Sequence, residues 1–197
     1  MLWWLKRGGI VNGETMSGKR LTRERWLSAA LEVVAQKGGA KLRVRDLVQN
    51  LGVSTGSFYW HFRSRDEFVA KLVDYWGREF TSRVVEHMAD VEGDPRKRLL
   101  LLMEYLLEHD FAHYDVAIRA WAAQEPAVAS RVRRVDQLRL GVVRSLFKEM
   151  GFSGKELEMR TSTFVVFHSL ELGFLVHASK KERRRHLRAR HTFFTKP

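Results

Sequence analysis

The chain has 197 residues, 45% of them apolar and only three of them proline, so a folded protein is expected rather than a disordered one. It contains no cysteine, which excludes disulfide scaffolds and thiolate zinc sites, and it has no run near the ~18 apolar residues of a membrane span. The formal charge of +12 indicates an anionic partner, either nucleic acid or an anionic membrane surface. The absence of a span and of cysteine favours a cytoplasmic protein.

The charge is unevenly distributed along the chain. Residues 1–65 carry 12 Lys/Arg against 4 Asp/Glu, residues 66–179 carry 15 against 18, and residues 180–197 carry 8 against 1. An ordinary solvated surface mixes its signs, whereas here a basic head and a basic tail flank a mildly acidic body. This pattern predicts a two-part organisation.

The first 66 residues predict an arm and three short helices. Residues 1–20 show no hydrophobic period and contain four glycines, so a disordered arm is expected, with a DNA minor-groove arm as the alternative. A helix follows Thr22 and ends at Gly38 and Gly39. A second helix over 44–51 ends at Gly52, and Ser54 is placed to cap a third.

The remainder predicts helices only. Ser64 and Glu67 form a capping box that opens a long helix, and similar boxes stand at 153–156 and 179–182. We therefore predict an all-α fold of about nine helices. Its parts are the arm at 1–20, a helix-turn-helix domain at 21–66, and a larger helical domain for ligand binding and dimerisation at 67–197.

The segment NLGVSTGSFYWHF (residues 50–62) carries the functional signal. Two short helices joined across a glycine turn form a helix-turn-helix unit. Steps of 100° per residue place Phe58 and Phe62 inward and Trp60 opposite them. Gly56 leaves the backbone free to approach base edges. The Tyr-Trp-His group at 59–61 is therefore expected to face DNA.

This region resembles the tetracycline-repressor (TetR) family of bacterial transcriptional regulators. The resemblance covers roughly Leu21 to Val73 and rests on RVRDLVQNLGVSTGSFYWHFRSRDEFV, preceded by ERWLSAALEVVAQKGG. It implies a three-helix DNA-binding domain whose fourth helix joins a larger helical domain. That larger domain usually forms a homodimer and holds an inducer pocket.

The resemblance also implies which residues contact DNA. Tyr59, His61 and Arg65 match phosphate-contacting positions, and Arg45 matches a position that can read a guanine. Arg43 departs from the family's usual Thr or Ser, so it would hold a phosphate by charge and leave its helix without the usual cap. The full expected set is Arg43, Arg45, Ser54, Thr55, Gly56, Ser57, Tyr59, Trp60, His61 and Arg65.

Residues 154–178 are apolar on nearly every face, and such a helix must be covered on all sides. We expect helices 126–150 and 154–178 to pair with their copies in a second subunit as a four-helix bundle. Burial wholly within one subunit is the alternative. The expected interface residues are Leu157, Val166, Ser169, Leu170, Gly173 and Phe174.

An inducer pocket is expected among the helices of the larger domain. Its candidate lining residues are Met103, Leu107, Phe111, His113, Trp121, Phe164, Phe167 and His168, although such an aromatic stripe is also typical of plain core. The eight histidines form no HExxH motif, so neither a metal site nor a cofactor is expected. The basic tail KKERRRHLRAR suits either a solvated helix face or non-specific DNA attraction.

The sequence therefore predicts a ligand-responsive repressor that binds a palindromic operator as a homodimer and is released by a small-molecule inducer. A constitutive dimeric DNA-binding protein without an inducer is the alternative. A small helical enzyme is the remote one, because the chain has no G-x-S-x-G motif and no phosphate-binding loop.

Overall fold

The computed structural model describes residues 21–109, 111–174 and 179–196, and these residues form helices and connecting loops without a strand. The predicted all-α fold is confirmed. The predicted arm at 1–20 lies outside the described residues. The elements are α1 (Arg23–Lys37), η1 (Gly39–Lys41), α2 (Val44–Leu51), α3 (Thr55–His61), α4 (Arg65–Gly77), η2 (Arg78–Ser82), α5 (Arg83–Ala89), α6 (Pro95–His109), α7 (Ala112–Ala122), α8 (Pro126–Glu149), α9 (Gly154–Phe174) and α10 (Lys180–Thr195).

Local sequence signals set several of these boundaries. The Thr22 hydroxyl accepts a hydrogen bond from the Arg25 amide and caps α1. Gly52 ends α2 in the left-handed conformation (φ 63°), which glycine adopts without strain. At α10, Ser179 and Glu182 form a complete capping box. Ser54 occupies the N-cap position of α3, but its side chain makes no capping hydrogen bond, contrary to the prediction.

The long helix predicted after Ser64 is interrupted. Residues 65–77 are α-helical, residues 78–82 form a π-helical turn, and α5 then continues. Such turns are rare and often mark functional sites. This one places Phe80 and Thr81 in the wall of a cavity described below.

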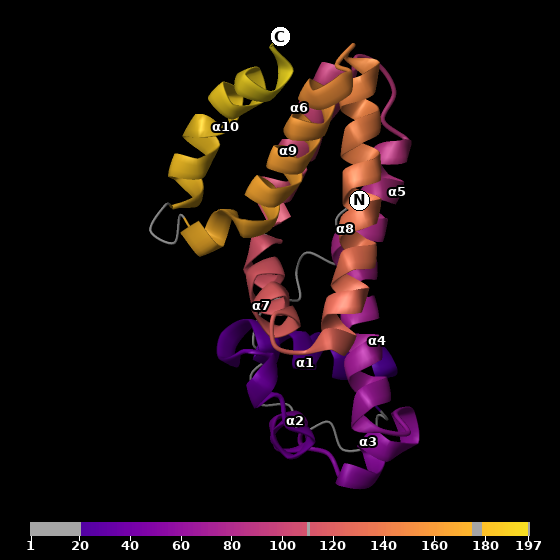
Figure 1. Cartoon of the computed structure of the whole chain (residues 1–197). Helices are drawn as coiled ribbons and strands as arrows, with labels where there is room; N and C mark the ends of the chain where they lie inside the picture. The colour runs from indigo at the N-terminus through magenta and orange to yellow at the C-terminus, as the bar shows by residue number, and fades with distance from the viewer. Residues whose placement is uncertain (1–20, 110, 175–178, 197) are drawn as a thin grey trace.

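The molecule is elongated, with α2 and α3 at one end and α10 at the other (Figure 1). One hydrophobic core joins α1, α2, α3 and α4 to Ile118 and Trp121 of α7 and to Val128 and Val132 of α8. A second core joins α5, α6, α9 and α10 to the C-terminal half of α8. The N-terminal helices therefore share their core with α7 and α8. In the described part of the chain, no helix has the length and apolarity to cross a bilayer.

Candidate DNA-binding surface and ligand cavity

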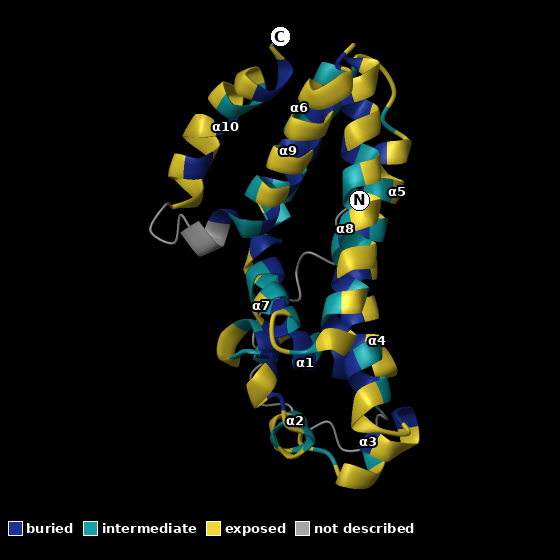
Figure 2. Cartoon of the chain, viewed as in Figure 1, coloured by how far each residue is buried: buried dark blue, intermediate teal, exposed yellow. Residues whose placement is uncertain are grey.

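Two buried phenylalanines anchor the inner face of α3 to the hydrophobic core, as predicted. Phe58 and Phe62 are 0% and 1% exposed, and the Phe58 ring packs edge-on against Trp26 at 5.6 Å. On the other side of the helix, Tyr59 and Trp60 are 60% and 59% exposed. Figure 2 shows that much of the chain is coloured as exposed at the end of the molecule where α2 and α3 lie. Exposing two large aromatic rings to water is unfavourable, which indicates a surface built for a partner.

The expectation that His61 faces outward with these rings is wrong. His61 is 8% exposed, and its ring packs at 4.6 Å from the Trp60 ring. It follows Phe58 by three residues, and a rotation of about 300° returns it to the inward side of the helix. Its carbonyl accepts a hydrogen bond from Arg23 Nη2 at 2.8 Å, which ties the end of α3 to α1.

The other expected DNA-contacting residues cluster around α3. Arg43, Arg45, Ser54, Thr55, Gly56 and Arg65 are exposed, and Ser57 is half-buried. Arg43 stands at the N-cap of α2 without a side-chain capping bond, as predicted. A Cβ added at Gly56 would meet only the Ser54 hydroxyl, at 3.7 Å, so the fold itself does not require glycine there. Close approach of a partner gives a reason for this glycine.

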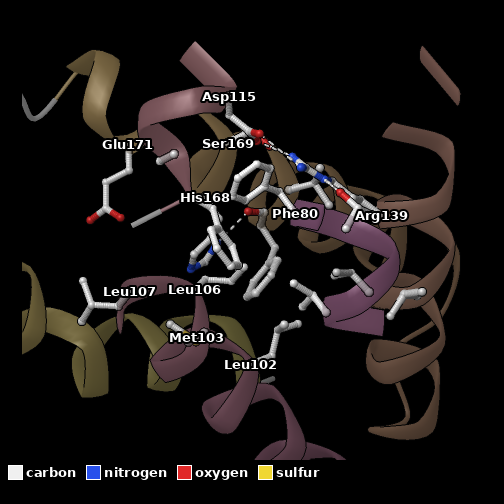
Figure 3. Close-up of a pocket in the computed structure, with 18 of the residues that line it drawn as sticks. Phe80, Leu102, Met103, Leu106, Leu107, Asp115, Arg139, His168, Ser169 and Glu171 are labelled. Carbon is white, nitrogen blue, oxygen red and sulfur yellow. Dashed lines mark hydrogen bonds and ion pairs between the residues drawn. The ribbon is translucent and has the colours of Figure 1, made fainter. Parts of the chain in front are cut away.

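A cavity of about 90 Å³ lies between α5, α6, α7, α8, α9 and α10 (Figure 3). Its wall is mainly apolar, with residues such as Val84, Met88 and Leu102. Polar groups stand among them, and Figure 3 shows Glu171 on one side of His168 and the Asp115–Arg139 pair on the other.

Five of the eight predicted pocket residues line this cavity: Met103, Leu107, Phe111, Phe164 and His168. The prediction is wrong for the other three. Trp121 packs over Gly39 in the N-terminal core, and the exposed His113 shares a separate surface hollow with it. Phe167 lies beneath the Arg190 guanidinium, whose centre is 5.0 Å from the ring.

A buried ion pair forms one wall of the cavity. Asp115 is 2% exposed and accepts hydrogen bonds from Trp76 Nε1 at 3.0 Å and from Arg139 Nη2 at 3.2 Å. Arg139 also donates from Nε to Thr81 Oγ1 at 2.8 Å and from Nη1 to Asp115 and to Ser169. This network connects α7 and α8 with α4, the π turn and α9.

A second buried ion cluster lies on the α10 side. Glu171 is 7% exposed, and its Oε1 accepts from Arg190 Nη1 at 2.5 Å. Arg183 Nη1 stands 3.8 Å from Glu171 Oε2. Between the two clusters, burial lowers the pKa of His168 to about 4, and its Nδ1 contacts the Phe164 carbonyl at 2.8 Å. His168 is therefore neutral at pH 7.

These ionic groups were not among the residues predicted from the sequence. Asp115 and Glu171 lie within largely apolar helices, where a charged residue is itself a signal of a buried pair or a site, whereas Arg139 lies in a helix with several other charged residues. Arg183 and Arg190 belong to the basic tail, for which a solvated helix face or non-specific attraction to DNA was expected.

The expected dimer residues divide into two groups. Leu157 is 3% exposed and belongs to the second core, while Ser169 is 4% exposed and accepts from Arg119 and Arg139, so neither can meet a partner subunit as predicted. Val166 is 55% exposed and Leu170 is half-buried. Gly173 and Phe174 fall outside the residues whose side-chain surroundings are described.

Other apolar residues are exposed on the same two helices. Met159 of α9 is 65% exposed, and Leu138 of α8 is 41% exposed. Met159 and Val166 are seven residues apart and so lie on one face of α9. Among the described residues, no group of three or more His, Asp or Glu side chains is placed to hold a metal ion.

Comparison with known proteins supports the resemblance. Residues 27–72 match the model of the bacterial regulatory proteins of the tetR family. The chain is 25% identical over 87 residues to the transcriptional regulator AcrR of Shigella flexneri, which covers 44% of this chain and 40% of AcrR. It is 27% identical over 96 residues to the transcriptional repressor NemR of Escherichia coli, covering 49% of this chain and 48% of NemR. These matches span less than half of each relative.

Solved structures extend the similarity over the larger domain. The structure of reduced Escherichia coli NemR superposes with a TM-score of 0.71 at 18% identity and covers 85% of this chain and 94% of NemR. The Bacillus subtilis regulator FadR, in complex with stearoyl-CoA, gives a TM-score of 0.71 at 14% identity and covers 88% of this chain and 98% of FadR. Residues 27–72 therefore carry the N-terminal sequence pattern of the tetR family of bacterial regulatory proteins, and the described helices of the chain share the fold of the solved regulators NemR and FadR.

Proposed function

We propose that the protein is a homodimeric DNA-binding repressor whose operator affinity is lowered by a small molecule bound in the cavity. The observation that carries the proposal is the exposed Tyr59–Trp60 pair on a short helix fixed by buried phenylalanines. Such a helix fits the major groove, where side chains read base edges. The surrounding Arg43, Arg45 and Arg65 would contact phosphates or a guanine.

The exposed apolar residues of α8 and α9 support the proposed dimer. Leu138, Met159 and Val166 would be covered by the same face of a second copy, as in a two-fold symmetric four-helix bundle. Gly141 is also exposed on α8, and nothing lies within 4 Å of a Cβ added there, so a partner helix could approach closely. The dimer would hold its two reading heads, each made of α1 to α3 of one subunit, at a fixed spacing. Each reading head would then bind one half of a palindromic operator.

The ligand response is supported by the place of the cavity. Its wall contains the π turn that continues α4, and α4 packs against α3 through the contact between Phe68 and Phe58 at 5.1 Å. A ligand that favours one position of α4 would change the separation of the two heads and thereby the operator affinity.

Selection of binding sites from a randomised DNA duplex, followed by fluorescence anisotropy on the selected duplex, tests the DNA-binding part. Trp60→Ala should weaken binding about tenfold or more, because a side chain that contacts bases contributes ~1–3 kcal/mol. The melting temperature should not change, since Trp60 lies outside the core. Phe193→Ala, which removes an exposed aromatic ring from α10, is the matched control.

Recovery of no palindromic site, or equal DNA affinity for both variants, would refute the proposed reading head. If the protein binds DNA constitutively, the selection would still recover a site. No compound in a screen would then release the protein from that site. That outcome would remove the ligand response and leave the DNA-binding function.

A further inference from the structure

The polar side chains in the wall of the cavity indicate which class of molecule it binds, and this inference rests on the proposed ligand response. Two carboxylates and two hydroxyls of the wall already accept a hydrogen bond from an arginine. These groups are Asp115, Thr81 and Ser169, which accept from Arg139, and Glu171, which accepts from Arg190. A ligand that donated to any of them would meet a group that already holds a charged donor.

The imidazole of His168 differs from these four groups. Burial lowers its pKa to about 4, so the ring is neutral at pH 7 and carries a single N–H. Its Nδ1 lies 2.8 Å from the Phe164 carbonyl oxygen, which can only accept a hydrogen bond. The proton is therefore on Nδ1, and Nε2 is left as an acceptor.

Nε2 of His168 is open to the cavity. It has no hydrogen-bond partner among the described residues, yet it is not one of their polar atoms that are buried without a partner, as Nε2 of His61 is. His168 is half-buried and lines the cavity, and Figure 3 shows it between Glu171 and the Asp115–Arg139 pair. A molecule in the cavity can therefore reach this acceptor.

The rest of the wall favours a small hydrocarbon body. Val84, Met88, Leu102, Met103 and Phe164 surround the space. Its volume of about 90 Å³ is several times the ~10–15 Å³ that one water needs and is below the ~150 Å³ of an engineered cavity that binds benzene. A single ring or short chain would need only small side-chain movements to enter.

His168 also favours a ligand without charge. An anionic oxygen is an acceptor and cannot form a hydrogen bond with Nε2, which is itself an acceptor. A cation would find both carboxylates of the described wall, Asp115 and Glu171, already paired with arginines. A neutral hydroxyl supplies the one proton that Nε2 can accept and adds no charge to a largely apolar space.

We propose that the cavity binds a small neutral phenol or alcohol, whose hydroxyl donates a hydrogen bond to Nε2 of His168. The apolar part of the ligand would lie against α5, α6 and α9. His168 would thereby favour a hydroxyl compound over a hydrocarbon of the same shape.

Isothermal titration calorimetry on the full chain without DNA tests the proposal with phenol and toluene, which share one ring, are similar in size and differ in the donor. His168→Leu removes the acceptor and should weaken phenol binding about tenfold without weakening toluene binding. The comparison between variants is needed because removing a hydroxyl from water lowers affinity for any apolar cavity. His113→Leu, which removes an exposed histidine outside this cavity, is the matched control and should change neither affinity.

Nitrogen-15 NMR of the histidine side chains provides a second measurement on the wild-type protein. The signals lost in a folded His168 variant, either His168→Leu or His168→Gln, belong to His168, and thermal unfolding shows which variant is folded. The proton should be on Nδ1, and the Nε2 signal should move toward that of a hydrogen-bonded nitrogen with phenol but not with toluene. A proton on Nε2 would overturn the proposal.

Three results of the titrations would also overturn it. They are binding of neither phenol nor toluene, a change of phenol affinity in His168→Leu no larger than that of toluene, and tighter binding of benzoate or benzylamine than of phenol. Because DNA is absent from the titration, phenol binding through His168 without any effect on operator affinity would instead refute the proposed ligand response and leave the hydroxyl site standing.

Discussion

Replacing Asp115 by Asn should cost about 3 kcal/mol of the free energy of unfolding, at the lower end of the ~3–5 kcal/mol typical when one partner of a buried ion pair is removed. The side chain of Asp115 is 3% exposed and that of Arg139 is 15% exposed, so Arg139 would keep a charge that little solvent can screen. An Asn side chain retains the shape and an acceptor for Trp76 Nε1, so the charge accounts for most of the loss. A loss of this size is a large share of the ~5–15 kcal/mol stability of an ordinary domain.

Urea unfolding followed by circular dichroism gives the free energies for Asp115→Asn, Arg139→Met and the double variant. The double variant should lose less than the sum of the single losses by at least ~1.5 kcal/mol, because removing both charges leaves neither unpaired. The control is Glu158→Gln, which breaks an ion pair with Arg144 whose side chains are 59% and 49% exposed. That variant should lose about 1 kcal/mol or less. Additive losses, or an Asp115→Asn cost no larger than the control, would refute the assignment of a buried, strongly coupled pair.

Three further predictions concern other parts of the molecule. Gly39→Ala should lower the melting temperature, because its Cβ would overlap the Trp121 ring that fills this position, and calorimetry measures the change. Val166→Glu should yield a monomer with weak operator affinity in analytical ultracentrifugation and anisotropy, whereas Leu101→Glu, an exposed apolar residue on α6, should remain dimeric. The unfolding free energy should fall as the pH drops from 6.5 to about 4, by up to about 1.4 kcal/mol per pH unit, because the unfolded chain protonates His168 while the folded chain keeps it neutral. His168→Gln should flatten this slope, and an unchanged slope would contradict the burial argument.

The N-terminal helices could be predicted from the sequence because their determinants are local. Phe58 and Phe62 are one helical turn apart, so periodicity alone assigns them to the core, and Gly52 permits the left-handed turn between the two helices. The prediction for His61 is wrong because adjacency to Tyr59 and Trp60 in the sequence does not place its ring on the same side of the helix. Its angle on the helix wheel placed it close to Phe58, and burial followed the angle.

The cavity was less predictable because its members come from distant segments. Asp115 and Arg139 are 24 residues apart, and Glu171 and Arg190 are 19 apart, so no spacing rule connects them. Trp121 has a large aromatic side chain of the kind that often lines pockets, yet its position on α7 places it against Gly39. The π turn at 78–82 has no recognisable sequence signal, because the apolar stripe continues through it.

The structure gives a physical route by which events in the cavity could reach the reading heads. Asp115 lies on α7 one turn before Ile118, which belongs to the N-terminal core, and it also holds Trp76 of α4. A ligand that alters the Asp115–Arg139 contact would therefore act on α4 and α7, two of the helices that form that core. Helices α4 and α7 both pack against α1, so a shift of either helix would also move α1. The reading head would therefore respond as a rigid unit. The coupling between ligand binding and DNA binding then depends on how much more tightly the ligand binds to one position of the reading head than to the other. A ligand that fills the cavity without disturbing Asp115 should therefore bind without releasing DNA.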